Sequence, residues 1–214
     1  LLCRDKRGEE PPPPPAAGLQ VGVPSTPRAL PTPIPRQEAR ACLTAWLERS
    51  LIAFDGIFTK ARGRAYEGLS FEDEGQWGES YDFVQLADPQ LGMLHADADW
   101  TEELTMLRLA IQHCNRLRPR FLLISGDLIN AFPSPDLPDG GAVPARQVAS
   151  FKEALHDLSP SIPLVLIPGN HDIGQVPTAG DIERYRERFG DDYFSFWVGG
   201  VLYVALNSQY YRDD

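Results

Sequence analysis

Three short apolar segments, each followed by polar residues, limit what this chain can fold into. Residues 81–87 (YDFVQLA) alternate between apolar and polar side chains and stop at Asp88-Pro89. Residues 121–125 (FLLIS) and 164–167 (LVLI) are continuous apolar runs. Such segments predict strands, and the continuous runs predict strands that are buried on both faces.

Helical patterns alternate with these strands. Apolar residues recur at three- and four-residue steps between a D-x-x-E box at Asp99 and Pro119, and similar patterns cover 145–158 and 178–190. A hairpin follows, because two apolar stretches flank residues 198–200 (VGG). The order β-α-β-α-β-α-β-β predicts an α/β fold with right-handed crossovers and a mainly parallel sheet.

Side chains that can do chemistry follow the strands. In an open α/β sheet the ligand site lies outside the carboxyl ends of the strands, and here Asp88, Asp127, Asn170 and His171 occupy those positions. Adjacent parallel strands lie about 4.8 Å apart, so these side chains converge if the strands are neighbours. Carboxylate, amide and imidazole groups together suit divalent metals such as Mn, Mg, Fe or Zn. The pattern therefore predicts a metal site at this edge of the sheet.

The same residues carry a resemblance to a known family. The pattern D-x-x … G-D … G-N-H-D, with each part at a strand end, resembles the calcineurin-like metallophosphoesterases, whose site binds two divalent metal ions. Longer stretches resemble the branch of this family described as serine/threonine phosphatases. They are 87–92 (ADPQLG), 168–174 (PGNHDIG), 190–202 (GDDYFSFWVGGVL) and 206–209 (LNSQ). The resemblance implies the N-terminal part of a metallophosphoesterase β-sandwich with flanking helices.

The resemblance also implies roles for individual residues. Asp88 would bind the first metal, Asp127 would bridge the two metals, and Asn170 would bind the second. A bridged pair lowers the pKa of a bound water, producing hydroxide, and neutralises phosphoryl charge. His171, oriented through Asp172, would protonate the departing alkoxide.

Two features depart from the family pattern. Gln90 stands where the broader family has the histidine of D-x-H, and its amide oxygen is a weaker metal ligand than imidazole. Two five- or six-coordinate metals need about ten ligand positions including water, yet no histidine follows His171. We therefore expect residues 57–214 to be an incomplete phosphoesterase domain, truncated at its C-terminal end. Such a domain would have a partial metal site, an exposed sheet edge and an exposed apolar face.

The first part of the chain differs in composition from the rest. Residues 1–60 hold ten of the twenty prolines and carry a net charge of +2, whereas 61–214 carry −12. We expect 1–56 to form a disordered proline-rich arm, in which 41–54 have the pattern of a short amphipathic helix. An acidic body repels nucleic acid and anionic membranes. Three cysteines without a CxxC spacing favour a reducing, cytoplasmic location.

These observations predict a metal-dependent phosphoesterase that uses a dimetal-activated hydroxide. The resemblance implies a phosphoprotein or a small phosphomonoester as substrate, with activity impaired in a truncated chain. Two alternatives remain open at this point. One is a non-catalytic interaction protein that keeps half of a metal site, and the other is a nucleotide phosphodiesterase of the same superfamily.

Overall fold

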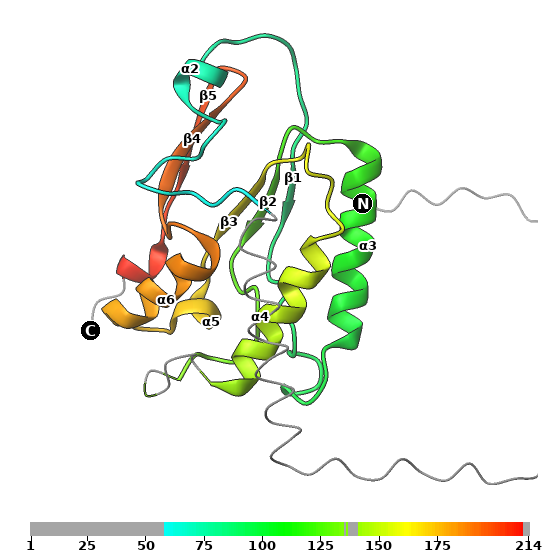
Figure 1. Ribbon diagram of the computed structural model, residues 1–214, viewed down its shortest axis with the longest axis vertical. Helices are drawn as coiled ribbons and strands as arrows, with labels where there is room; N and C mark the ends of the chain where they lie inside the picture. Colours follow the sequence, from blue (N-terminus) through cyan, green and yellow to red (C-terminus); the bar gives the residue numbers. More distant parts are fainter. Residues whose placement is uncertain (1–57, 135, 137–140, 212–214) are drawn as a thin grey trace, which may run out of the picture. The chain divides into compact units, whose positions relative to one another are not determined.

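The computed structural model in Figure 1 describes residues 58–134, 136 and 141–211. The proline-rich arm predicted for 1–56, with its helical pattern, lies outside these residues. Within the described ranges, no helix has both the length and the apolar character needed to cross a membrane.

A parallel sheet of three strands lies at the centre. Its strands are β1 (Val84–Leu86), β2 (Leu122–Ser125) and β3 (Leu164–Ile167), in the spatial order β1-β2-β3. The register pairs Leu86 with Ile124 and Ser125 with Ile167. The three predicted strands are therefore neighbours, and their carboxyl ends lie at one edge of the sheet.

The remaining elements follow the predicted order. Helix α3 (Thr101–Leu117) connects β1 to β2, and α4 (Ala142–Leu155) connects β2 to β3. After β3 come α5 (Asn170–Ile173), α6 (Ala179–Phe189) and a hairpin of β4 (Phe194–Val198) and β5 (Val201–Ala205). The order β-α-β-α-β-α-β-β is thus confirmed. A short helix α2 (Phe71–Glu74) before β1, the one-turn α5 and a final 3-10 turn η1 (Ser208–Tyr211) are additional.

The start of α3 differs from the prediction by one residue. Trp100 is the N-cap residue, and its side chain makes no capping hydrogen bond. The carboxylate of Asp99, expected to open the helix, instead accepts a hydrogen bond of 2.8 Å from the hydroxyl of Thr101. Thr178 caps α6 as its sequence indicates, since its hydroxyl accepts from the backbone N–H of Asp181.

The central sheet lies beside helices α3 and α4 (Figure 1), and its alternating side chains contribute to two layers of the interior. One set of strand side chains packs against α3, α4 and α6, and the opposite set packs against the β4–β5 hairpin. The helix layer contains Leu107, Ile111, Cys114, Leu122, Ile124, Val148, Phe151, Leu155, Leu164, Leu166, Ile182 and Phe189. The hairpin layer contains Tyr66, Leu69, Phe121, Val165, Phe194, Phe196, Val198 and Ala205.

Aromatic rings form the contact between the two sheets. Phe121, which is fully buried, stacks on Phe83 with 4.8 Å between ring centroids. It also meets Phe196 and Tyr203 edge to face, at 5.4 and 5.1 Å. Rings in such arrangements add to the stability gained from area burial. This sheet-on-sheet packing confirms the predicted fold class.

The outer strand of the hairpin exposes apolar side chains. Val201, Leu202 and Val204 of β5 are 37%, 47% and 60% exposed. In the described part of the chain β5 pairs with β4 alone. The expected exposed edge and exposed apolar face are both present here.

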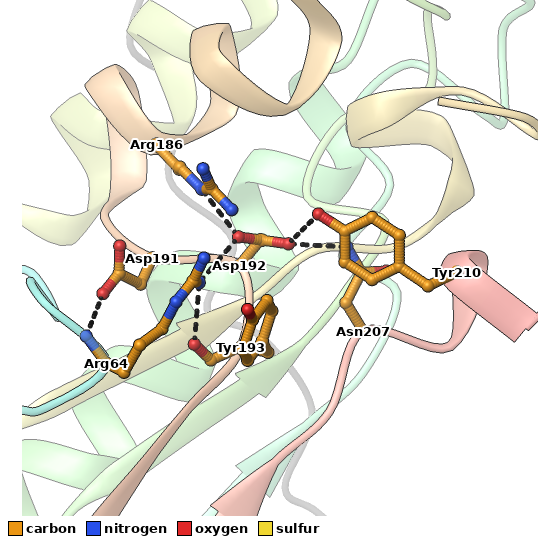
Figure 2. A network of polar contacts seen from close by, with 7 residues as sticks. All are labelled: Arg64, Arg186, Asp191, Asp192, Tyr193, Asn207 and Tyr210. Atoms are coloured by element: carbon orange, nitrogen blue, oxygen red, sulfur yellow. Dashed lines mark hydrogen bonds and ion pairs between the residues drawn. The ribbon is translucent and has the colours of Figure 1, made fainter. Parts of the chain in front are cut away.

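A buried carboxylate joins segments that are far apart in the sequence (Figure 2). Asp192 has no exposed surface. Its Oδ1 accepts hydrogen bonds from Arg186 Nε at 2.8 Å and Arg64 Nη1 at 3.1 Å. Its Oδ2 accepts from Asn207 Nδ2 at 3.0 Å and the Tyr210 hydroxyl at 2.8 Å. One side chain thereby links the segment before α2, the end of α6, the residues after β5, and η1.

These hydrogen bonds decide the ionisation of Asp192. Burial by itself raises the pKa of the carboxyl, but the bonds from Asn207, Arg186, Tyr210 and Arg64 outweigh burial and lower the pKa to about 2. An unfolded aspartate has a pKa of about 3.9. The folded state therefore binds the proton less well than the unfolded state, and the stabilisation is present above about pH 4 and lost as the pH falls toward 2.

We predict that Asp192→Asn lowers the free energy of unfolding by about 2 kcal/mol at pH 7, because charge-assisted hydrogen bonds to two partly exposed arginines are weakened. Urea titrations followed by tryptophan fluorescence measure this difference. It should shrink as the pH falls from about 4 toward 2. The matched control is Asp157→Asn, at an exposed aspartate, which should leave stability unchanged. A deficit of constant size across this pH range would contradict the assignment.

Candidate active site

Backbone pairing continues beyond the ends of β1 and β2. The N–H of Asp88 donates to the Gly126 carbonyl at 3.2 Å, and the N–H of Gln90 donates to the Asp127 carbonyl at 2.8 Å. Asp88, Gln90 and Asp127 adopt left-handed backbone conformations, with φ of 51°, 40° and 46°. Aspartate tolerates this conformation better than most residues. The two loops therefore leave the sheet together, and each carries a predicted site residue.

The loops after β2 and β3 touch through glycines. A Cβ on Gly126 would lie 2.8 Å from the backbone of Gly169, and a Cβ on Gly169 would lie 2.2 Å from Asp127 Oδ1. Neither position has room for a side chain. This contact places the Asp127 carboxylate against the first turn of α5, where Oδ1 accepts the backbone N–H of His171 at 2.9 Å.

The structure brings four of the predicted site positions to one edge of the sheet. Asp127 follows the central strand, while exposed Asp88 and half-buried Asn170 follow the strands on either side. His171, the second residue of α5, contacts Gln90, whose Nε2 lies 3.2 Å from His171 Nε2. Side-chain contacts thus join Asp127 and Gln90 to His171, whereas Asp88 shares with them the edge of the sheet; that these residues form one site is a proposal.

The His171 ring has two further partners. Its Nδ1 is hydrogen bonded to the backbone carbonyl of Asn130. Phe132 stacks on the ring, with 4.1 Å between centroids and 28° between planes. Asn130 and Phe132 were not among the residues proposed from sequence. The sequence offers one indication that they belong to the site, namely that they follow Asp127 in the same loop.

Asp172 contacts the backbone of the neighbouring loops. Its carboxylate accepts from the N–H of Gly169 at 2.8 Å and from that of Leu128 at 3.0 Å. Burial raises the pKa of this carboxyl to about 7; the hydrogen bond from Gly169 opposes the rise, and the charge of Asp127 adds to it. Asp172 thus links the loops after β2 and β3 through hydrogen bonds to their backbone. The His171 ring, predicted to be oriented through Asp172, instead contacts Asn130 and Gln90.

The donor groups at this edge suit a hard divalent cation. Asp88 and Asp127 offer carboxylates, and Asn170 and Gln90 offer amide oxygens, which are the ligand types that such cations take. Among the residues that the structure describes, no three His, Cys, Asp or Glu side chains group into a metal site. The residues present therefore fit the chemistry of such a cation but fall short of the ligands that two would need.

Comparison with known proteins gives the class. Residues 81–212 match the family model of the calcineurin-like phosphoesterases. The chain belongs to the calcineurin-like phosphoesterase family, a family of hydrolases, as the motifs at the strand ends indicate.

Curated relatives are similar over most of the chain. A protein of Danio rerio is 40% identical over 174 residues, covering 76% of this chain and 54% of the relative. A protein of Homo sapiens is 41% identical over 169 residues, with 74% and 52% covered, and one of Bos taurus is 40% identical with the same coverage. All three are named serine/threonine-protein phosphatase CPPED1. This chain spans about half the length of these relatives.

We predict that Gly169→Ala weakens Mn²⁺ binding about tenfold, because the new Cβ must displace the Asp127 carboxylate. Isothermal titration calorimetry on the metal-stripped chain measures the affinity. Gly180→Ala is the matched control, since its nearest neighbour would be the Thr178 hydroxyl at 3.7 Å. Equal affinities for folded Gly169→Ala and the wild type would show that the Gly169 contact does not support metal binding.

Proposed function

We propose that the protein is a metal-dependent phosphomonoesterase that removes phosphate from phosphoserine or phosphothreonine in proteins. One observation carries the proposal: in a chain of this family, Asp88, Asp127, Asn170 and His171 follow three neighbouring parallel strands at the carboxyl edge of the sheet. The names of the relatives support the substrate class. A small phosphomonoester is the simpler substrate of the same chemistry.

The proposed cofactor is a pair of divalent metal ions, Mn, Mg, Fe or Zn. Asp88 and Asn170 would each hold one ion, Asp127 would contact both, and Gln90 would add an amide oxygen. When bound, such ions neutralise phosphoryl charge and acidify the attacking water. The shortage of donors among the described residues supports a weakly held metal and a low turnover in this chain.

The chain's own residues would bind and orient the substrate and move one proton. The Asn130 carbonyl is hydrogen bonded to Nδ1 of His171, so Nε2 is the nitrogen that would take up a proton and then pass it to the leaving alkoxide. Asp127 is held in place by the His171 backbone N–H. Phe132 covers one face of the imidazole and would keep water from that face.

The setting of this activity is also a proposal. The excess of acidic residues in 61–214 (24 Asp and Glu against 12 Lys and Arg) disfavours nucleic acid and anionic membranes as partners. Sparse cysteines, with Cys114 buried as a free thiol, support a reducing compartment such as the cytoplasm.

We predict that the chain supplied with Mn²⁺ hydrolyses an aryl phosphate and a phosphoserine peptide, and that Asp127→Asn and His171→Ala each lower kcat by a factor of about 10² or more. Steady-state kinetics measure this. The control is His113→Ala, at an exposed histidine of α3, which should retain full activity. Retention of activity by His171→Ala would remove this residue from the mechanism.

A second candidate is favoured by the short ligand set: a non-catalytic protein that keeps half of a metal site. Binding of Mn²⁺ by a folded chain that turns over neither substrate would select this candidate. A bis-aryl phosphate in the same assay distinguishes the third possibility, because a nucleotide phosphodiesterase would prefer the diester.

A further inference from the structure

A series of hydrogen-bonded side chains runs from buried Gln147 of α4 to the predicted site. Gln147 of α4 has no exposed surface. Its Oε1 accepts the backbone N–H of Ala131 at 2.9 Å, and its Nε2 donates to Asp97 Oδ1 at 2.8 Å. Because the backbone N–H can only donate, the orientation of the Gln147 amide is fixed, and Nε2 must face Asp97.

Asp97 continues this series toward the imidazole. Its Oδ1 also accepts from Asn130 Nδ2 at 2.9 Å. The Oδ1 of Asn130 accepts from Gln90 Nε2 at 3.3 Å, and that same Nε2 lies 3.2 Å from His171 Nε2. Three loops, those after β1, β2 and β3, are therefore connected by one series of hydrogen bonds.

The carboxylate of Asp97 sets the direction of every hydrogen bond in this series. A carboxylate accepts only, so Asn130 must present Nδ2 to Asp97 and its oxygen to Gln90. Gln90 must then present its NH₂ group, and His171 Nε2 must act as the acceptor. The proton of the neutral ring consequently resides on Nδ1, where the Asn130 carbonyl accepts it. Both sides of the ring thus select the same tautomer.

The loop after β1 is shaped to hold Asp97 in this position. The N–H of Asp97 donates to the Gly92 carbonyl at 2.9 Å, and Asp97 itself is left-handed, with φ of 66°. A Cβ on Gly92 would lie 2.2 Å from Gln147 Nε2 and 2.7 Å from Asp97 Oδ1. Only glycine leaves room there for the contact between Asp97 and Gln147.

We propose that Asp97, supported by Gln147, is a positioning residue that fixes His171 as its Nδ1–H tautomer. In that tautomer Nε2 carries no proton, so it would first take up the proton that the attacking water loses and then pass that proton to the leaving alkoxide, with the Gln90 amide turning away from Nε2 as it does so. The catalytic meaning of this role rests on the proposed phosphatase function, but the tautomer is a property of the folded chain alone. Only Nε2 of Gln90 takes part in this series of hydrogen bonds. The Gln90 amide oxygen takes no part in it and is the atom that could bind a metal.

The direct test is the ¹⁵N NMR spectrum of the histidine rings of the full chain, labelled with ¹⁵N-histidine and stripped of metal. It is recorded near pH 8, where free imidazole in water is neutral. The chain has four histidines, and His171→Ala identifies the His171 signals. We expect a protonated Nδ1 and an unprotonated Nε2 in the wild type. A wild-type ring protonated at Nε2 would overturn the proposal.

Variants then test whether Asp97 sets the tautomer of His171 or only stabilises the fold. Asp97→Ala frees the Asn130 amide to turn over, so the share of the Nε2–H tautomer should rise about fivefold, the effect of losing one hydrogen bond. Asp97→Asn keeps one accepting oxygen and should retain the wild-type tautomer. The matched control is Asp99→Ala, two residues away, whose carboxylate bonds Thr101 instead; it should not alter the ring. An unchanged His171 tautomer in folded Asp97→Ala would overturn the proposal.

Two further measurements keep the proposal falsifiable. If Asp97→Ala does not fold, Asn130→Ala removes the same link while keeping the backbone carbonyl, and it should give the same rise in the Nε2–H tautomer; an unchanged tautomer there counts against the proposal. In an active chain, Asp97→Ala should lower kcat more for an alkyl phosphate than for an aryl phosphate, with KM little changed, because the poorer leaving group depends more on His171. Equal losses on both substrates would also count against it.

Failure of the wild type to turn over either substrate would reject the proposed function, whereas the NMR spectra would still decide the positioning role.

Discussion

The contact between the backbones of Gly126 and Gly169 is the constraint on which the site depends. Because no side chain fits between the loops after β2 and β3, Asp127 is pressed against the first turn of α5. The Asp172 carboxylate links the same two loops by accepting hydrogen bonds from the N–H groups of Gly169 and Leu128. The arrangement is built largely from backbone atoms, so its geometry follows from the parallel register of the strands.

The strand positions could be predicted because they depend on local pattern. Continuous apolar runs identify β2 and β3, and a parallel sheet brings their carboxyl ends together whatever the details of packing. The start of α3 could not be predicted with the same accuracy. There the Thr101 hydroxyl donates to the carboxylate of Asp99, and the order of residues does not show that Asp99 prefers this partner to the backbone of the helix.

The imidazole of His171 contacts residues of loops that are far from it in the sequence. Such contacts are not visible in the sequence, where the adjacent Asp172 is the residue predicted to orient the ring. Adjacency suggested a partner beside His171, whereas the ring contacts residues 41 and 81 positions earlier, Asn130 and Gln90. Asp192 illustrates the same limit. Its partners range from Arg64 to Tyr210, and an acidic residue in a run of charged residues gives no sign that it will be fully buried.

The left-handed backbone at Asp88 and Asp127 has a consequence for how the site can be studied. Aspartate and asparagine share an unusual tolerance of this conformation, which alanine and most other residues lack. Replacement by asparagine removes the charge and leaves the preferred backbone intact, while replacement by alanine changes both together. At these two positions the amide is therefore the informative substitution, since a loss seen with alanine would mix the chemistry of the carboxylate with the shape of the loop.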